Sequence, residues 1–230
     1  MNDQIYLIGD VHGCYKTLCA LIDRLPRGAD SKICFVGDLI DRGEGSFEVV
    51  QLAMRCDYAA VMGNHEYRLL QHKDAFLRGE TPSDPRWFYL NGGAQTFASY
   101  AKASRAQKLA HIEFLSNLPL YLEFDEFKNT QGRRLVVSHS AAGRMWPLRN
   151  SDGDSAAEFR RHVLCGRGDF SQNEGVFNVY GHTPIAGPDI TEFSANIDTG
   201  CVYKHDFGHL CALEFPSMRV FMQENIEDGG

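Results

Sequence analysis

Long apolar runs are missing from this sequence of 230 residues. No stretch approaches the roughly 18 consecutive apolar residues that a membrane-spanning helix needs. The start, MNDQIYLIGD, also has no basic segment leading into a long apolar stretch, which a secretory signal would show. We therefore predict a cytoplasmic protein that makes no contact with a membrane.

Paired cysteine motifs are missing as well. The seven cysteines are odd in number and lie singly in apolar surroundings, without C-x-x-C spacing. This pattern argues against a disulfide framework or a structural zinc site. It favours reduced thiols that are mostly buried.

Positive charge is scarce, because 23 lysines and arginines stand against 30 aspartates and glutamates, for a net charge of −7. General nucleic-acid binding needs a broad basic surface to displace counterions from phosphates, so this mode is not expected. The sequence contains no repeat, low-complexity segment or linker. With 43% hydrophobic residues, it predicts one globular domain over residues 1–230, with a frayed tail at IEDGG (226–230).

Short apolar runs and helical patterns alternate along the first part of the chain. Apolar residues at spacings of three and four predict helices over 14–25 and 46–56, and residues 65–118 are predicted to form a mostly helical insertion. Strands are predicted again at 120–124, 209–215 and 219–225. The alternation predicts an α/β fold whose sheet places its site at the carboxyl ends of the strands. The five runs that predict buried strands are IYLI (5–8), ICFV (33–36), AAVM (59–62), LVV (135–137) and FNVY (177–180).

Each of these five strands is followed by polar residues that could bind metal ions. Asp10 and His12 are one residue apart, so an extended segment would place both side chains on the same side, able to hold one cation. Asp38 leaves the next strand and could bridge this cation to a second one. The ligands predicted to complete the second site are Asn64, His139 and His182.

A ligand set of carboxylate, imidazole and amide groups suits Mn, Fe or Zn. Two such ions about 3.5–4 Å apart would activate a bridging water and hold the attacking and leaving oxygens of a phosphoryl transfer. The sequence thus predicts hydrolysis of a phosphoester. In the stretch GNHE, Asn64 and His65 are adjacent, and adjacent residues on an extended chain point to opposite sides, so the two are predicted to do different jobs.

The ordered motifs GDVHG, GDLIDRG, GNHE, a strand-ending His139 and GHT resemble those of the calcineurin-like metallophosphoesterases. They are most similar to the phosphoprotein phosphatase branch, and within it to small bacterial and phage members such as the lambda-type phosphatase. The resemblance spans residues 9–200. It implies an α/β domain with two sheets packed as a β-sandwich flanked by helices, and a dinuclear site at the strand ends.

The resemblance also implies roles for single residues. Asp10, His12 and Asp38 would hold the first metal, and Asp38, Asn64, His139 and His182 the second, with Mn favoured and Fe or Zn as alternatives. His65 would be the general acid, oriented by Asp41. Arg42 would bind the phosphate together with Arg167, for which Arg144 or Arg149 could substitute.

The chain departs from the family pattern at two places, and three functions are considered. The chain has SHSAAG (138–143) where the family has HGG or HAG, which adds the Ser140 hydroxyl, and the surroundings of Arg167 match loosely.

The favoured function is a phosphatase acting on phosphoserine or phosphothreonine in proteins, with phosphotyrosine and small aryl phosphates as further substrates. The alternatives are a symmetrical diadenosine tetraphosphate hydrolase, favoured by GHTP and DTGCV (198–202), and a non-catalytic metal-binding scaffold.

Two further features receive structural predictions. The IDTG stretch (197–200) is predicted to be mainly architectural. Trp87, Phe88 and Tyr89 are predicted to lie on the buried face of a helix, with a substrate wall as the alternative. The remaining histidines are predicted to be structural or solvated; these are His72, His111, His162, His205 and His209.

Overall fold

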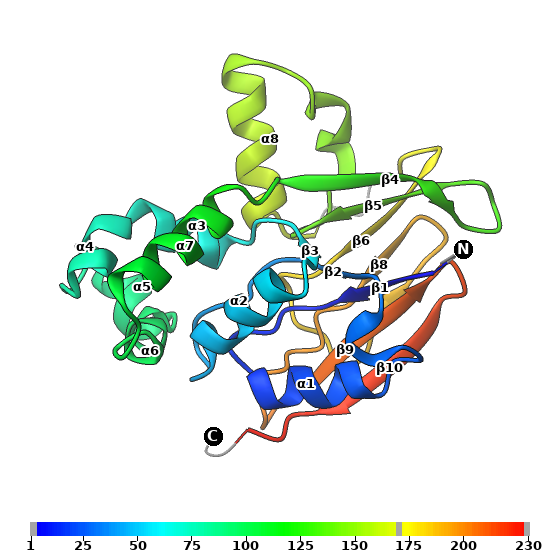
Figure 1. Ribbon diagram of the computed structural model, residues 1–230. Coiled ribbons are helices and arrows are strands. Elements are labelled where there is room, and N and C mark those ends of the chain that lie inside the picture. The colour runs from blue at the N-terminus through cyan, green and yellow to red at the C-terminus, as the bar shows by residue number, and fades with distance from the viewer. Residues whose placement is uncertain (1–3, 169–171, 228–230) are drawn as a thin grey trace.

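Two five-stranded sheets lie face to face at the centre of the protein, in a computed structural model that describes residues 4–168 and 172–227 (Figure 1). Strands β1, β2 and β3 run parallel in the first sheet, as do β5, β6 and β8 in the second. In spatial order, the first sheet consists of β10 (Arg219–Glu224), β9 (His209–Phe215), β1 (Ile5–Ile8), β2 (Ile33–Phe35) and β3 (Ala59–Ala60). The second consists of β4 (Tyr121–Lys128), β5 (Arg134–Ser138), β6 (Val176–Tyr180), β8 (Ser194–Asn196) and β7 (Asp189–Ile190).

Both faces of β1 in the first sheet are covered, which explains why this strand is apolar throughout rather than alternating. On β1, Ile5 and Leu7 join the core between the two sheets, whereas Tyr6 and Ile8 join the core under the helices. Helices α1 (Tyr15–Asp23) and α2 (Ser46–Arg55) contribute to the second of these cores. The run IYLI is therefore buried from both sides.

The other helices lie in two places (Figure 1). Helix α8 (Gly153–Cys165) and the 3-10 helix η2 (Gly143–Leu148) pack on the second sheet through a separate apolar cluster. A further 3-10 helix, η1, covers Gly28–Asp30. Between β3 and β4 the chain forms α3 (Asn64–Gln71), α4 (Lys73–Arg78), α5 (Pro85–Leu90), α6 (Gly93–Ser99) and α7 (Arg105–Ser116).

The predicted fold class is confirmed, since two mixed sheets are flanked by helices. All five apolar runs contain strands, although β3 keeps only two residues of its predicted four. Within the predicted frayed tail, the Ile226 N–H donates to Thr17 Oγ1, and Glu227 Oε1 accepts from the Thr17 N–H; residues 228–230 lie outside the described residues. Among the described residues, no helix is long and apolar enough to cross a membrane.

Candidate metal centre and active site

The loops that follow the strands converge on one buried region and adopt unusual backbone conformations. Five non-glycine residues in these loops have left-handed backbones, with φ between 46° and 72°. Each such residue costs about 1–3 kcal/mol unless its surroundings enforce it, and such strain concentrates at functional sites. The five residues are His12, Asp38, Asp41, Arg42 and His182.

One group of donor atoms forms around His139. Its Nδ1 donates to the Val36 carbonyl at 2.9 Å, and burial lowers its pKa, so the ring is neutral and Nε2 carries a lone pair. That lone pair faces Asn64 Oδ1 at 2.9 Å and Asp38 Oδ1 at 3.4 Å, which are both acceptors. His182 Nδ1 is 3.1 Å away, and burial lowers the pKa of His182 to about 3. A cation between these atoms would satisfy the acceptors that face one another.

A second group forms around His12. Its Nδ1 donates to the Ile40 carbonyl at 2.9 Å, so its Nε2 lone pair faces Asp38 Oδ2 at 3.5 Å. Burial, followed by the Arg42 charge, lowers the pKa of His12 well below its usual value and keeps the ring neutral. A backbone carbonyl that fixes the ring in this manner is typical of a metal-binding histidine. His65 Nε2 lies 3.9 Å from the same carboxylate oxygen.

Asp38 is shared by both groups, as His12–Asp38–His65 and as Asp38–His139–His182, and within each group the donor atoms lie within 4.8 Å of one another. Burial opposes the charge of Asp38, but the surrounding histidines outweigh it and hold its pKa well below the usual range. A permanently ionised carboxylate with one oxygen toward each group suits two divalent cations. The residues present therefore fit the divalent metals of a phosphoesterase.

Asp10 differs from its predicted geometry. The left-handed backbone of His12 breaks the extended segment that would have aligned the two side chains, and neither donor group contains Asp10. Its carboxylate instead accepts the His182 N–H at 3.1 Å. Burial, then the charges of Asp198 and Asp38, raises the pKa of Asp10 well above its usual value. Asp10 and Asp198 are thus two buried carboxyl groups beside the donor groups, and a cation bound there would favour their charged forms.

His65 and Asp41 form a buried pair, as the resemblance implied. His65 Nδ1 lies 2.6 Å from Asp41 Oδ2. Burial disfavours the charged imidazole, but the carboxylates of Asp38 and Asp41 outweigh this effect and raise the pKa of His65. With Nδ1 bound to a carboxylate, Nε2 is the nitrogen that can give a proton to a substrate.

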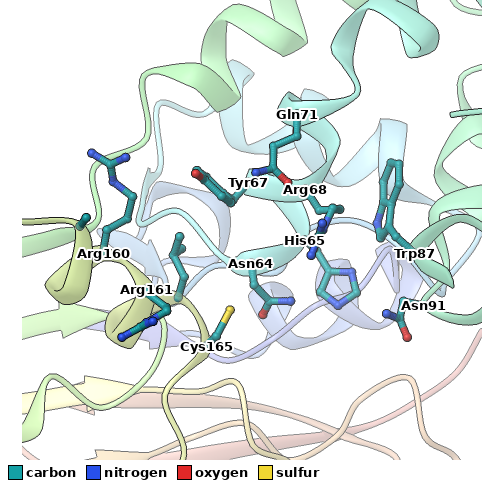
Figure 2. Close-up of a pocket in the computed structure, with 12 residues that line it drawn as sticks. Asn64, His65, Tyr67, Arg68, Gln71, Trp87, Asn91, Arg160, Arg161 and Cys165 are labelled. Carbon is teal, nitrogen blue, oxygen red and sulfur yellow. The ribbon is translucent and has the colours of Figure 1, made fainter. Parts of the chain in front are cut away.

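Asn64 and His65 do not lie on an extended segment, because α3 begins at Asn64. The reason for predicting opposite directions was therefore wrong. The helical turn separates the two side chains instead, so Asn64 reaches His139 while His65 reaches Asp41. Both still line one pocket, where Figure 2 shows them side by side.

The two arginines predicted to bind phosphate lie beside different donor groups. The Arg42 side chain contacts His12 Nε2 and lies over the Tyr203 ring at 5.3 Å. Arg167 is exposed, and its Nη1 donates to Thr183 Oγ1 at 3.1 Å, one residue from His182.

Arg149, considered as a substitute for Arg167, is engaged on the outer side of the second sheet. It pairs with Glu123 Oε1 at 3.1 Å and lies over Trp146 at 4.4 Å. Arg144, the other substitute, belongs to the η2 helix that packs beside α8. Arg167 is therefore better placed for a phosphate beside His182 than Arg149 is.

The Ser140 hydroxyl does not point into the donor groups. It donates to the His162 carbonyl of α8 at 2.7 Å, and the Ser140 N–H donates to the Val163 carbonyl at 2.8 Å. The Ser140 side chain is buried. The departure from HGG therefore anchors α8 to the end of β5 instead of adding a hydroxyl beside the metals.

Glu66 was given no role from the sequence, although it belongs to GNHE. It is fully buried, and its carboxylate accepts four backbone N–H groups, from Asp38, Leu39, Ile40 and Gly63. A side chain at Gly63 would collide with Asp38, since an added Cβ would lie 2.2 Å from Asp38 Oδ1. Glu66 and Gly63 together hold the Asp38 loop. Their place in the GNHE motif was the feature of the sequence that could have indicated this role.

Glu66→Ala is expected to lower the free energy of unfolding by about 3 kcal/mol or more, because it leaves several buried N–H groups without an acceptor. Glu66→Gln keeps an acceptor oxygen and should lose less. Urea unfolding followed by circular dichroism measures both variants. A loss below about 1 kcal/mol for Glu66→Ala would show that the Asp38 loop keeps its conformation without the Glu66 carboxylate.

Asp41 is held by residues from the helical segment that follows α3, a role the sequence did not reveal. Trp87 Nε1 donates to Asp41 Oδ2 at 2.7 Å, and Thr96 Oγ1 donates to Asp41 Oδ1 at 2.5 Å. His72 stacks on Trp87 with the ring centroids 5.3 Å apart, consistent with its predicted structural role. Trp87 is buried, as predicted, and it also lines the pocket beside His65, whereas Tyr89 of the same helix is exposed, contrary to the prediction.

Trp87→Phe is expected to lower kcat about tenfold with unchanged metal content, because it removes one hydrogen bond that orients Asp41. Steady-state kinetics and elemental analysis measure the two quantities. Trp146→Phe is the matched control, since Trp146 packs in the separate cluster under α8. Equal losses in both variants would point to a general packing defect.

The chain belongs to the calcineurin-like phosphoesterase family, whose model matches residues 4–192. Among curated relatives, an asymmetrical bis(5'-nucleosyl)-tetraphosphatase, PrpE, of Halalkalibacterium halodurans is 32% identical, and the alignment covers 94% of this chain and 91% of the relative. A protein of the same description from Geobacillus sp. is 30% identical and aligns over 94% and 92% of the two chains.

Solved structures share the fold. A candidate diadenosine tetraphosphatase aligns with a TM-score of 0.72 at 20% identity, over 100% of this chain and 96% of the other. A protein serine/threonine phosphatase of Saccharomyces cerevisiae aligns with a TM-score of 0.58 at 15% identity, over 99% and 82% of the two chains.

Proposed function

We propose that this phosphoesterase hydrolyses dinucleoside tetraphosphates asymmetrically, to a nucleoside monophosphate and a nucleoside triphosphate. The observation that carries the proposal is the alignment, over nearly the full length of both chains, with relatives described as asymmetrical tetraphosphatases. This replaces the protein phosphatase that the motifs favoured and changes the symmetrical cleavage of the alternative. Family membership sets the non-catalytic scaffold aside.

The proposed metal ligands are Asp10, His12 and Asp38 for one ion and Asp38, Asn64, His139 and His182 for the other, with Mn favoured over Fe or Zn. Two bound divalent ions would activate water and neutralise charge on the attacked phosphate. His65 then donates the proton on Nε2 to the leaving oxygen, while Asp41 holds the ring through Nδ1. Arg42 and Arg167 bind the oxygens of the phosphate, for which the planar guanidinium is suited.

A comparison of substrates tests this function. The Mn-loaded protein is given diadenosine tetraphosphate, a phosphoserine peptide and p-nitrophenyl phosphate, and products are separated by anion exchange. We expect AMP and ATP, with kcat/KM at least about 100-fold above that for the peptide, a difference of about 2.7 kcal/mol in transition-state binding. ADP as the sole product would indicate symmetrical cleavage. A higher kcat/KM for the phosphoserine peptide would instead support the protein phosphatase function.

A further inference from the structure

A pocket of about 380 Å³ opens beside His65, between α3, α5 and α8 (Figure 2). Three arginines line it, Arg68 from α3 and Arg160 and Arg161 from α8, and no aspartate or glutamate does so among the described residues. Arg68 also pairs with Asp84 at 3.2 Å, outside the lining. On a chain of net charge −7, this concentration of positive charge marks a site for an anion. We call it the arginine pocket.

The position of His65 indicates which part of a substrate enters the arginine pocket. A general acid must reach the leaving oxygen, so the group beyond the acid is the leaving group. Arg42 and Arg167, which are proposed for the attacked phosphate, do not line the arginine pocket but two other hollows. Arg68, Arg160 and Arg161 line the pocket on the leaving-group side of His65, although Arg160 also lines a neighbouring hollow.

The charge of the arginine pocket selects the leaving group. An alcohol such as a serine side chain has no charge to pair with three guanidinium groups, whereas a triphosphate chain has several. The volume also lies within the range of roughly 300–1,000 Å³ that is common for ligand pockets. Resting on the proposed function, we infer that the arginine pocket binds the triphosphate chain of the leaving nucleotide.

This assignment sets the direction of cleavage. Water attacks the phosphorus of the nucleoside monophosphate, and its oxygen stays on that product. The bond between this phosphorus and the bridging oxygen breaks, and the bridging oxygen leaves with the triphosphate after taking the His65 proton. The proton lost by the attacking water passes to solvent, from which His65 is recharged. No redox partner or further reactant is required.

Hydrolysis of diadenosine tetraphosphate in ¹⁸O-labelled water tests the direction. Mass spectrometry of the products should find one ¹⁸O in AMP and none in ATP. Label in ATP would overturn the inference while leaving asymmetrical cleavage intact. If ADP alone forms, both the proposed cleavage and the triphosphate assignment are wrong.

Charge removal tests the arginines. Arg160→Gln combined with Arg161→Gln should raise KM for diadenosine tetraphosphate at least about tenfold, since charge-assisted hydrogen bonds are lost. The KM for p-nitrophenyl phosphate, whose leaving group has no phosphate, should change less than about twofold. Lys102→Gln with Arg105→Gln removes two charges from exposed positions that no described pocket shares and is the matched control. Equal changes for both substrates would overturn the inference.

Cys165 provides a readout that needs no turnover. It lines the arginine pocket and is the exposed one of seven cysteines, all of which are described. In the metal-loaded protein, ATP should slow alkylation of Cys165 by iodoacetamide more than AMP does, and the Arg160/Arg161 double variant should lose this protection. Protection without hydrolysis of diadenosine tetraphosphate would overturn the proposed function but support the pocket. Equal or absent protection by the two nucleotides would overturn the pocket.

Discussion

His65→Asn is expected to lower kcat for diadenosine tetraphosphate by about 10²–10⁴-fold while the protein keeps its bound metal, because the acid that protonates the leaving oxygen is lost. His65 is placed for this role by the 2.6 Å contact of its Nδ1 with Asp41. Steady-state kinetics measure the loss, and elemental analysis measures the metal. Loss of metal in this variant would instead make His65 a ligand, as its 3.9 Å approach to Asp38 allows geometrically.

Two further variants sharpen the test of His65. His205→Asn makes the same substitution at an exposed histidine and should leave kcat unchanged. Asp41→Asn should also lower kcat, but adding it to His65→Asn should cost little more, because residues that act as a unit are not additive. Full additivity of the two losses would show that Asp41 acts independently of His65.

Asp38→Asn is expected to abolish the dinuclear site, because Asp38 is the carboxylate that both donor groups share. We expect bound metal to fall to about one ion or fewer per chain and kcat/KM to fall at least about 10³-fold, since both proposed metal functions depend on it. Elemental analysis after desalting measures the metal, and kinetics at saturating Mn measure the activity. A fully loaded, active variant would refute the bridging role.

Thermal unfolding separates loss of metal from loss of folding. A ligand that binds only the folded state raises the melting temperature, so Mn should stabilise the wild-type protein and not Asp38→Asn. The metal-free variant should melt below the metal-free wild type, because the lowered pKa of Asp38 means that the folded protein favours the charged carboxylate at neutral pH, and asparagine removes that contribution. Asp206→Asn, at an exposed aspartate, is the control and should respond to Mn like the wild type. A metal-free Asp38→Asn that is already unfolded would indicate a structural role.

The predicted site for the first metal shows one limit of reasoning from the sequence. Asp10 and His12 were paired because alternate residues of an extended chain share a side. The positive φ of His12 removes that alternation, and the Asp10 carboxylate accepts a hydrogen bond from the His182 N–H. Backbone angles of this kind depend on contacts with other loops, which a local pattern does not contain.

The Asp41 contacts show the same limit over a longer distance. Trp87 and Thr96 lie 46 and 55 residues from Asp41 and follow no motif around it. Their contacts exist because the helices after α3 fold back onto the GDLIDRG loop, where the Gly92 carbonyl accepts the Arg42 N–H. The arginine pocket likewise joins α3 and α8, which are separated by about 80 residues of chain.

The sequence alone determined the α/β class, the buried strands and the kinds of donor atoms at the strand ends. These features depend on which residue types follow one another locally along the chain. Tertiary structure decided which atoms face one another: Asp38 between two donor groups, Trp87 and Thr96 on Asp41, and three arginines beyond His65. The physical reason is that hydrogen bonds and charge interactions act over a few ångströms. They depend on how distant segments pack and not on their order in the chain.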